Sequence, residues 1–186
     1  IQWFNFEGMG KSPSRLDIKK LNNVSAHHIK NSNTEALAQD LFSYASEVGR
    51  SIPKETKNQI ISSIPIVREK SKLLGDILDK CHFILTTRPI DFDIKSSESL
   101  NSVSIGILNQ LTLLLSDVSW TASELEVLAR DFASEQGISL GKVGMPLKAA
   151  LSGRANAPSA FGMMEVLGQD ESLARIKEVI KNYRPI

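Results

Sequence analysis

The feature that most constrains this chain is the helical spacing of its apolar residues, which runs almost unbroken from Asp17 onward. Apolar residues at positions 73, 74, 77, 78, 81 and 84, for example, follow the three- and four-residue steps that line one helix face. Residues 1–16 differ, because Trp3-Phe-Asn-Phe6 is typical of a short extended piece and a glycine-containing turn follows it. The pattern predicts an all-α fold of two consecutive small helical lobes with a short non-helical N-terminal remnant.

Capping residues locate the first two helices. Asp17 is expected to cap a helix that ends near Ile29. Ser32 and Glu35 form a capping box that opens the second helix. The side chains expected to point inward from these two helices are Ile18, Leu21, Val24, Leu37, Leu41, Tyr44 and Val48.

Prolines and a break in the period divide the rest of the first half. Pro65 should break or kink a third helix, and the next helix is expected from Val67 to about Leu85. The segment Thr86–Asp93 interrupts the helical period and is the predicted linker between the lobes. The expected divisions are an N-terminal remnant over 1–32, a first lobe over 33–93 and a second lobe over 94–186.

The second lobe is expected to start near Ser97. Thr121 and Glu124 form a second capping box, and the helix that they open should stop at Gly137. Inward positions of the lobe's first helix are predicted at Leu100, Val103, Ile107, Leu111 and Leu114. Further helices are predicted over 139–151, 158–167 and 170–182.

Composition restricts the possible classes of protein. The 186 residues carry a net charge of +1 with 41% hydrophobic residues, which describes a globular protein and not a disordered one. The single Cys81 allows no internal disulfide, and no apolar run is long enough to cross a membrane. We therefore expect a cytoplasmic protein without membrane contact. Because the chain begins with Ile1 and not Met, we also expect it to be a piece of a longer protein.

No motif predicts catalysis or metal binding. Gly10-Lys11-Ser12 resembles the end of a phosphate loop, but the glycine required five residues earlier is Asn5. The adjacent His27 and His28 would point about 100° apart on a helix, and no His or Cys pair has metal-ligand spacing. No nucleophile elbow occurs either. We predict no catalytic, cofactor or metal site in this chain.

The strongest functional signal is a gap in negative charge near the C-terminus. No Asp or Glu occurs between Glu135 and Glu165, whereas Lys142, Lys148 and Arg154 fall inside this gap. Three cations without a counter-charge, set among small residues and two prolines, suit a surface that an anionic polymer approaches closely.

The residues of this gap also resemble a known family. The run Pro-Leu-Lys-Ala-Ala-Leu-Ser-Gly at 146–153, the Ala157-Pro-Ser-Ala-Phe161 helix start and the Leu167-Gly168 stop are similar to motifs of the C-terminal anticodon-binding region of bacterial-type glutamyl-tRNA synthetases. The segments 3–8, 20–29, 67–74 and 120–142 resemble further strings of the same family. The resemblance thus covers essentially the whole chain, and the catalytic half of such an enzyme would precede Ile1.

The resemblance implies tRNA as the partner, a monomer, and two lobes that hold the anticodon stem and loop. The longer enzyme would use ATP and Mg²⁺ to load glutamate onto tRNA, whereas this chain alone would be inactive. The implied tRNA-binding residues are Lys70, Lys142, Lys148, Arg154, Ala155, Ala157, Pro158 and Ala160, with Lys11 and Arg15 as stem contacts. An exposed helix N-terminus at Pro158 would add free N–H donors.

Lys70 marks a departure from the family pattern. It matches a position where members that reject glutamine tRNA carry an arginine that reads the third anticodon base. Lysine keeps the charge but lacks the planar fork of arginine. The resemblance therefore predicts that glutamine tRNA is accepted as well as glutamate tRNA.

Two other functions remain open on the sequence alone. The first is a helical protein-interaction module in which the basic loop is incidental. The second is a helix-turn-helix that binds DNA, formed by the helices on either side of Gly137. The second helix would offer only Lys142 and Lys148 as long polar side chains, which is few for base reading.

Overall fold

The computed structural model describes residues 17–115 and 118–184, and all regular elements within these ranges are helical, as predicted. The extended piece predicted within residues 1–16, with Lys11 and Arg15, lies outside the described residues. Among the described helices, none combines the length and the apolar character needed to cross a bilayer.

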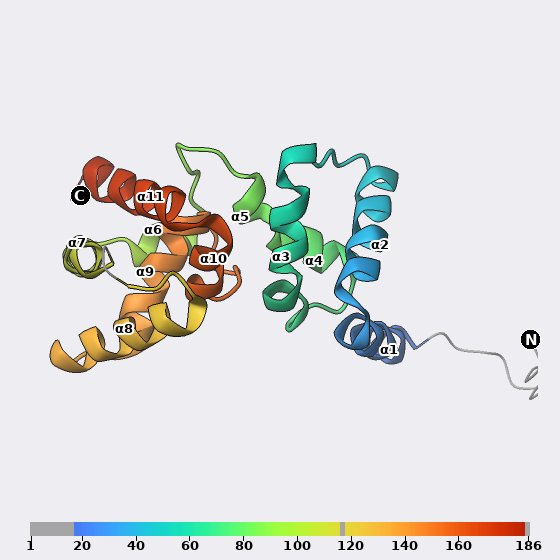
Figure 1. Ribbon diagram of the computed structural model, residues 1–186, viewed down its shortest axis with the longest axis horizontal. Coiled ribbons are helices and arrows are strands. Elements are labelled where there is room, and N and C mark those ends of the chain that lie inside the picture. The colour runs from blue at the N-terminus through green and yellow to red at the C-terminus, as the bar shows by residue number, and fades with distance from the viewer. Residues whose placement is uncertain (1–16, 116–117, 185–186) are drawn as a thin grey trace, which may run out of the picture.

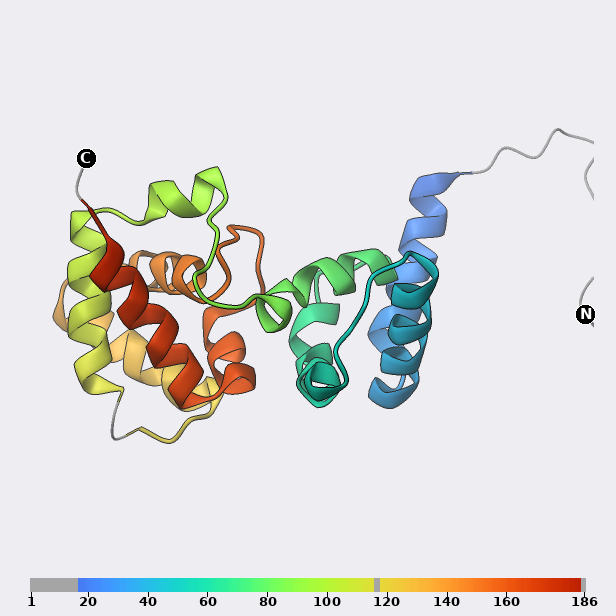
Figure 2. The ribbon, with the colours of Figure 1, turned by 90° about the horizontal axis from the view of Figure 1, so that it is seen from above.

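The helices gather in two groups with one short helix, α5 (His82–Leu85), between them (Figures 1 and 2). The first helical group contains α1 (Ile18–Asn31), α2 (Thr34–Glu47), the 3₁₀ turn η2 (Lys54–Thr56), α3 (Lys57–Arg68) and α4 (Leu74–Lys80). The second helical group contains α6 (Ile94–Ser99), α7 (Ser102–Leu114), α8 (Ala122–Glu135), α9 (Leu140–Ser152), α10 (Ala160–Leu167) and α11 (Gln169–Asn182). Residues 86–93, between α5 and α6, contain no helix, as the interrupted period predicts. In both views α1 lies on the side of the first group that faces away from the second.

Side-chain caps start the first two helices. Asp17 caps α1 as predicted. The capping box predicted at Ser32 is wrong by one residue, because the Asn33 side-chain oxygen accepts the N–H groups of Glu35 (2.9 Å) and Ala36 (3.1 Å). The Ser32 hydroxyl instead donates to a carbonyl in the last turn of α1. Asparagine is the better cap here, since one oxygen reaches two N–H groups that the helix leaves free.

Burial in the first group follows the predicted pattern only in part. Leu37 and Leu41 are buried, but Val48 at the end of α2 is 49% exposed, against the prediction. The inward prediction is also wrong in α1, where the exposed residues are Ile18 (63%), Leu21 (53%) and Val24 (48%). The one buried residue of this helix is Ile29, so α1 packs against the group through its C-terminal end.

The single helix predicted from Val67 to Leu85 is wrong. Helix α3 continues past Pro65 to its C-terminal end, and residues 69–73 form a turn before α4. This turn is held from inside α4, where Asp76 Oδ2 accepts the N–H groups of Lys72 (2.7 Å) and Leu73 (3.0 Å). The apolar spacing continues across the turn, so periodicity does not reveal it.

Helix α9 is the centre of the second group, and α6, α7, α8, α10 and α11 all pack against it. Its inward residues Val143, Leu147 and Ala150 are fully buried. Thr121 caps α8 as predicted, by accepting the N–H of Glu124 (3.3 Å). A helix surrounded in this way has little freedom to change its orientation, and this constrains the residues that it carries.

The predicted inward face of α7 is right at one position and wrong at others. Leu111 is buried as predicted, whereas Val103 and Leu114 are 73% and 46% exposed. Leu108 and Leu115 are buried without having been expected inside. Because α7 is apolar on most of its faces, its sequence does not indicate which face is buried.

The two groups meet along α3 and α10, and their buried side chains belong to one hydrophobic cluster. Gly162 of α10 lies so close to α3 that a Cβ atom at this position would be 2.9 Å from Ile66 Cγ2. Glycine therefore permits the close approach of the two helices. Helix α5 makes a second contact, against α9.

Candidate nucleic-acid interface

Lys148 is a half-buried cation on the most enclosed helix of the second group. Its neighbours Leu147 and Ala149 are buried, so the position of the Lys148 backbone is fixed by core packing. Burial lowers the pKa of Lys148, and the charge of Lys70 lowers it further. The second effect indicates that the charge of Lys70, in the first group, acts on Lys148, in the second group.

Lys70 lies in the exposed turn between α3 and α4, and polar contacts hold this turn in place. The Lys80 ammonium of α4 donates to the Lys70 carbonyl and to Ser71 Oγ (2.8 Å). Burial lowers the pKa of Lys80, Asp76 raises it, and Lys70 lowers it again. The turn therefore leaves the Lys70 side chain exposed while its backbone is tied to α4.

The pair formed by Lys70 and Lys148 has no counter-charge of its own. Within residues 17–115 and 118–184, neither ammonium group makes an ion pair or a hydrogen bond. Asp76 is nearby, but its carboxylate is engaged with the N–H groups of Lys72 and Leu73. Two unpaired cations, of which one lowers the pKa of the other, favour an anionic ligand because its charge would offset theirs.

Arg154 lies in a cleft of about 610 Å³ at the junction of the two groups, which we call the Arg154 cleft and which Arg50 and His82 also line. The Arg154 guanidinium donates to the Asp91 carbonyl (3.3 Å), and Arg50 is paired with Asp79 (2.6 Å). Burial lowers the pKa of His82, and the neighbouring arginines lower it further, Arg154 the most. Asp79, which also lines the cleft, raises the His82 pKa, but by less than the arginines lower it.

Asp93 also lines the Arg154 cleft and fixes the loop that follows α9. Its Oδ1 accepts the N–H of Ser96 (2.7 Å) at the start of α6, and its Oδ2 accepts the N–H of Ala155 (3.0 Å). These bonds lower the pKa of the Asp93 carboxyl. Gly153 completes the arrangement, since its φ of 67° and its closeness to the Asp91 carbonyl leave no room for a side chain. The N–H of Ala155 is thus occupied and is not free to bond a base.

The start of α10 differs from the prediction. The helix begins at Ala160, two residues later than expected, and both Pro158 and Ala160 are buried. Ser159 is exposed and precedes the helix without a capping bond from its side chain. The prediction of an exposed helix N-terminus at Pro158 is therefore wrong in position. Ala157, directly before Pro158, is half-buried.

Lys142 does not share a face with Lys148. The two residues are six positions apart on α9, which is about 120° around the helix axis. Lys142 is exposed near the N-terminus of the helix. Of the three cations in the acid-free segment, only Lys148 and Arg154 therefore lie toward the junction with the first group, each in its own surroundings.

Arg50 and His82 are site residues that the sequence did not predict. Arg50 follows α2 in a segment without a recognisable motif, so no signal indicated it. No motif indicated His82 either, and it is a half-buried residue whose Nε2 lies 2.9 Å from Thr86 Oγ1. Contacts between residues distant in the chain bring both into the Arg154 cleft.

Cys81 is a core residue. Burial raises the pKa of its thiol to about 11, which keeps it protonated and unreactive at neutral pH. The Ser63 hydroxyl lies 3.6 Å from its sulfur. In the described part of the chain, no three His, Cys, Asp or Glu residues gather as metal ligands do.

Comparisons of the sequence find a matching family and similar proteins. Residues 26–180 match a family model described as an anticodon binding domain. The chain is 43% identical over 177 residues to glutamate–tRNA ligase 1 of Dinoroseobacter shibae, which covers 95% of this chain and 38% of that protein. It is 41% identical over 180 residues to glutamate–tRNA ligase 2 of Ruegeria pomeroyi, with the same two shares. The chain thus spans 38% of the length of these relatives.

Solved structures share the fold. A crystal structure of a glutamate tRNA ligase from Elizabethkingia meningosepticum, in complex with its amino acid, superposes with a TM-score of 0.77 at 22% identity. The match covers 97% of this chain and 36% of that one. The glutamate–tRNA synthetase of Elizabethkingia anophelis gives a TM-score of 0.72 at 23% identity, over 96% of this chain and 34% of the other.

Proposed function

Because the chain belongs to the anticodon binding domain family, we propose that it holds the anticodon stem and loop of a tRNA as part of a glutamate–tRNA ligase. In this proposal the two lobes are residues 33–93 and 94–186, and both contact the same loop. Residues 1–32, which include α1, belong to the neighbouring region that contacts the stem, with Lys11 and Arg15 as its cations.

The observation that carries this proposal is the match of residues 26–180 to the anticodon binding domain family, and Lys70 and Lys148 are the cations that we propose for the contact. One lysine comes from each group, and neither has a partner among the described residues. A phosphate or the acceptor edge of an unstacked base would supply the missing negative charge. Arg154, which lines the Arg154 cleft, and Ala157 in the same loop after α9 are proposed as further contacts.

Binding of a glutamate tRNA transcript by the Lys148→Met variant tests this proposal. Methionine keeps most of the apolar stem and removes the charge. Loss of one charge-assisted contact should weaken binding by about 1–3 kcal/mol, or roughly 5- to 150-fold in Kd. The salt dependence of binding should also become shallower, because fewer counterions are released.

Lys142→Met is the matched control, since it makes the same change on another face of α9. It should weaken binding less than Lys148→Met does. Equal losses in the two variants would indicate diffuse attraction to positive charge and would contradict a defined site. Binding of an unrelated RNA hairpin with equal affinity would contradict anticodon recognition.

A second proposal concerns Lys70 and the tRNAs that the longer protein accepts. We propose that the flexible ammonium of Lys70 contacts one acceptor of the third anticodon base, so that the longer protein accepts glutamine tRNA as well as glutamate tRNA. Lys70→Arg should restore a planar, bidentate contact and increase the preference for glutamate tRNA. If the unaltered protein already rejects glutamine tRNA and Lys70→Arg changes nothing, discrimination lies elsewhere.

The chemistry of the ligase is proposed for the longer protein. That protein would use ATP, Mg²⁺ and glutamate, and it would load the tRNA in the cytoplasm as a monomer. No site for these small molecules is proposed in the present chain. Glutamate-dependent exchange between ATP and pyrophosphate by the isolated chain would contradict the proposal that the catalytic site lies outside this chain.

The two other functions find less support. A DNA-binding helix-turn-helix needs an exposed second helix, whereas α9 is covered by the other helices of the second group and by α5. A protein-interaction module would not explain why Lys70 and Lys148, one from each group, both lack an ion-pair partner among the described residues. Salt-dependent preference for tRNA over duplex DNA separates these functions from anticodon binding.

A further inference from the structure

Arg175 of α11 is an arginine in the core, with 3% of its surface exposed. Arginine is almost never buried this deeply unless its charge is paired, because removal of an ion from water is costly. Arg175 lies on the inward face of α11 with Ser172, Ile176 and Val179, so packing of the helix carries the guanidinium into the interior.

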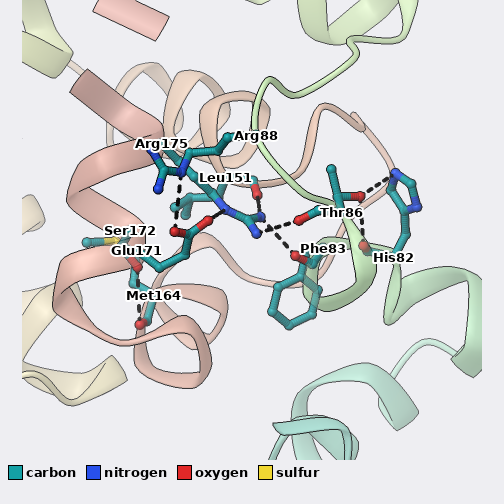
Figure 3. A network of polar contacts seen from close by, with 9 residues as sticks. All are labelled: His82, Phe83, Thr86, Arg88, Leu151, Met164, Glu171, Ser172 and Arg175. Carbon is teal, nitrogen blue, oxygen red and sulfur yellow. Dashed lines mark hydrogen bonds and ion pairs between the residues drawn. The ribbon is translucent and has the colours of Figure 1, made fainter. Parts of the chain in front are cut away.

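The guanidinium joins three separate segments, as Figure 3 shows. Nε lies 2.7 Å from Glu171 Oε1 on the preceding turn of α11. Nη1 donates to the carbonyls of Phe83 (2.8 Å) and Leu151 (2.5 Å), and Nη2 donates to the carbonyl of Thr86 (2.8 Å). Every nitrogen of the guanidinium therefore has a partner.

The three carbonyls lie at helix ends. Phe83 belongs to α5 and Thr86 follows that helix directly, while Leu151 is in the last turn of α9. Carbonyls in a last helical turn have no partner within the helix and carry partial negative charge. One planar side chain thus satisfies the C-terminal ends of α5 and α9 together, which a lysine with its compact charge does less well.

These two helix ends belong to different sides of the junction. Helix α5 follows α4 and the turn that carries Lys70, whereas α9 carries Lys148 one turn before Leu151. The apolar contact between α3 and α10 brings the groups together, but burial of apolar surface has no preferred direction. Hydrogen bonds are directional and can fix the orientation of α5 against α9.

We propose that Arg175 is a positioning residue that holds α5 against α9 and thereby fixes the orientation of the two helical groups that carry Lys70 and Lys148. This inference rests on the proposed binding of an anticodon loop by both groups. Arg175 itself touches no RNA. Its role is to present the two lysines at a fixed separation, so that the loop does not have to order them on binding.

Arg175→Lys tests the inference, with spin labels on cysteines introduced at the exposed positions Gln39 of α2 and Glu135 of α8. The native Cys81 is fully buried and should not take up the label. The variant keeps the positive charge but loses the planar guanidinium that donates to several carbonyls at once. We expect helix content to be retained, the distribution of distances between the labels to broaden, and tRNA affinity to fall by about tenfold or more. Lys148→Met should then weaken binding less in this background than in the unaltered protein.

Arg130→Lys is the control, because Arg130 is also paired with a glutamate four residues earlier on its helix but is exposed, and its polar contacts among the described residues are with that glutamate alone. Its distance distribution and affinity should match those of the unaltered protein. An unchanged distance distribution in a folded Arg175→Lys variant would overturn the inference. Global unfolding of both Arg175→Lys and Arg175→Met would also overturn it, because Arg175 would then support the core of the second group.

The distance measurement is made without RNA, so it separates the two proposals. If the unaltered protein fails to bind tRNA, the proposed function fails. Broadened distances in Arg175→Lys would still show that Arg175 sets the orientation of the groups. Weak tRNA binding by Arg175→Lys with unaltered distances would contradict a positioning role, because the loss of affinity would then not come from a change in the orientation of the groups.

Discussion

Lys70 and Lys148 bring the same charge to the same junction, yet they are held there by different forces. Lys148 stands on α9, which is covered by the other helices of the second group and by α5, so its backbone moves only if the core of the second group moves. Lys70 stands on an exposed turn whose backbone is held by Asp76 and Lys80 through hydrogen bonds. One cation is therefore fixed by packing and the other by a small polar network.

The segment directly after α9 should tolerate change least, because it shares the tight packing of that helix. Gly153 adopts a φ of 67°, and a Cβ there would lie 2.1 Å from the Asp91 carbonyl oxygen. Gly153→Ala should therefore lower the free energy of unfolding by about 2–5 kcal/mol, from the left-handed backbone and the clash together. Denaturant unfolding measures this loss.

Gly49 offers the matched control, because its φ is 72° and no atom lies within 4 Å of the added Cβ. Gly49→Ala should lower stability by only about 1–2 kcal/mol, the cost of the left-handed backbone alone. Equal losses of stability in the two variants would mean that the segment after α9 adjusts to the added methyl group at little cost. The contrast between a cation fixed by packing and one fixed by polar contacts would then be wrong.

The turn of Lys70 should be sensitive to the loss of one carboxylate. Asp76→Ala removes the acceptor for two backbone N–H groups and should lower stability by about 1 kcal/mol, as the loss of a helix cap does. Lys70 is then held less firmly, so tRNA affinity should also fall. The loss of about 1 kcal/mol is the most that binding can lose in this way, which corresponds to a fall in affinity of roughly five-fold or less. Unfolding and tRNA titrations measure the two effects.

Asp79→Ala controls for the lost negative charge on α4. The Asp79 carboxylate pairs with the exposed Arg50, and a surface pair of this kind contributes about 0–1 kcal/mol. Its removal should leave tRNA affinity equal or higher. If Asp76→Ala also leaves affinity equal or higher, the turn does not need its polar anchor.

The fold was predictable where local chemistry determines it. The caps at Asp17 and Thr121 could be recognised because their side chains bond N–H groups of their own helices. The turn at residues 69–73 could not, because the apolar spacing crosses it and its anchor, Asp76, lies three residues beyond it. The buried face of α7 was equally hidden, since nearly all of its faces are apolar.

The candidate site was predictable in its charges and not in its geometry. The acid-free segment indicated Lys148 and Arg154, but their nearness to Lys70 and His82 depends on how the two groups pack. Arg175 left one signal that could have been used. It is a charged residue on the inward stripe of an amphipathic helix, and such a position predicts a buried polar contact.

His82 should show the weakest effect, through its dependence on pH. Burial and the surrounding arginines hold the His82 pKa below 6.5 in the folded protein, so the unfolded chain binds a proton more readily. Stability should therefore be lost as pH falls through 6.5 toward the lower folded value, and it should be fully present above 6.5. His82→Gln should reduce this fall in the free energy of unfolding between about pH 7 and about pH 5. An identical pH dependence in both proteins would contradict this role of His82.

One lysine from each helical group is proposed to contact the same anticodon loop, whatever holds each lysine in place. Site-specific photocross-linking tests that shared contact directly, with glutamate tRNA as the probe. A photoreactive amino acid replaces Lys70, Lys148 or, as the control, Lys142. Cross-links from positions 70 and 148 should map to nucleotides of the anticodon loop, with few from position 142. Cross-links from 70 and 148 to different regions of the tRNA, or equal yields from all three positions, would contradict the shared contact.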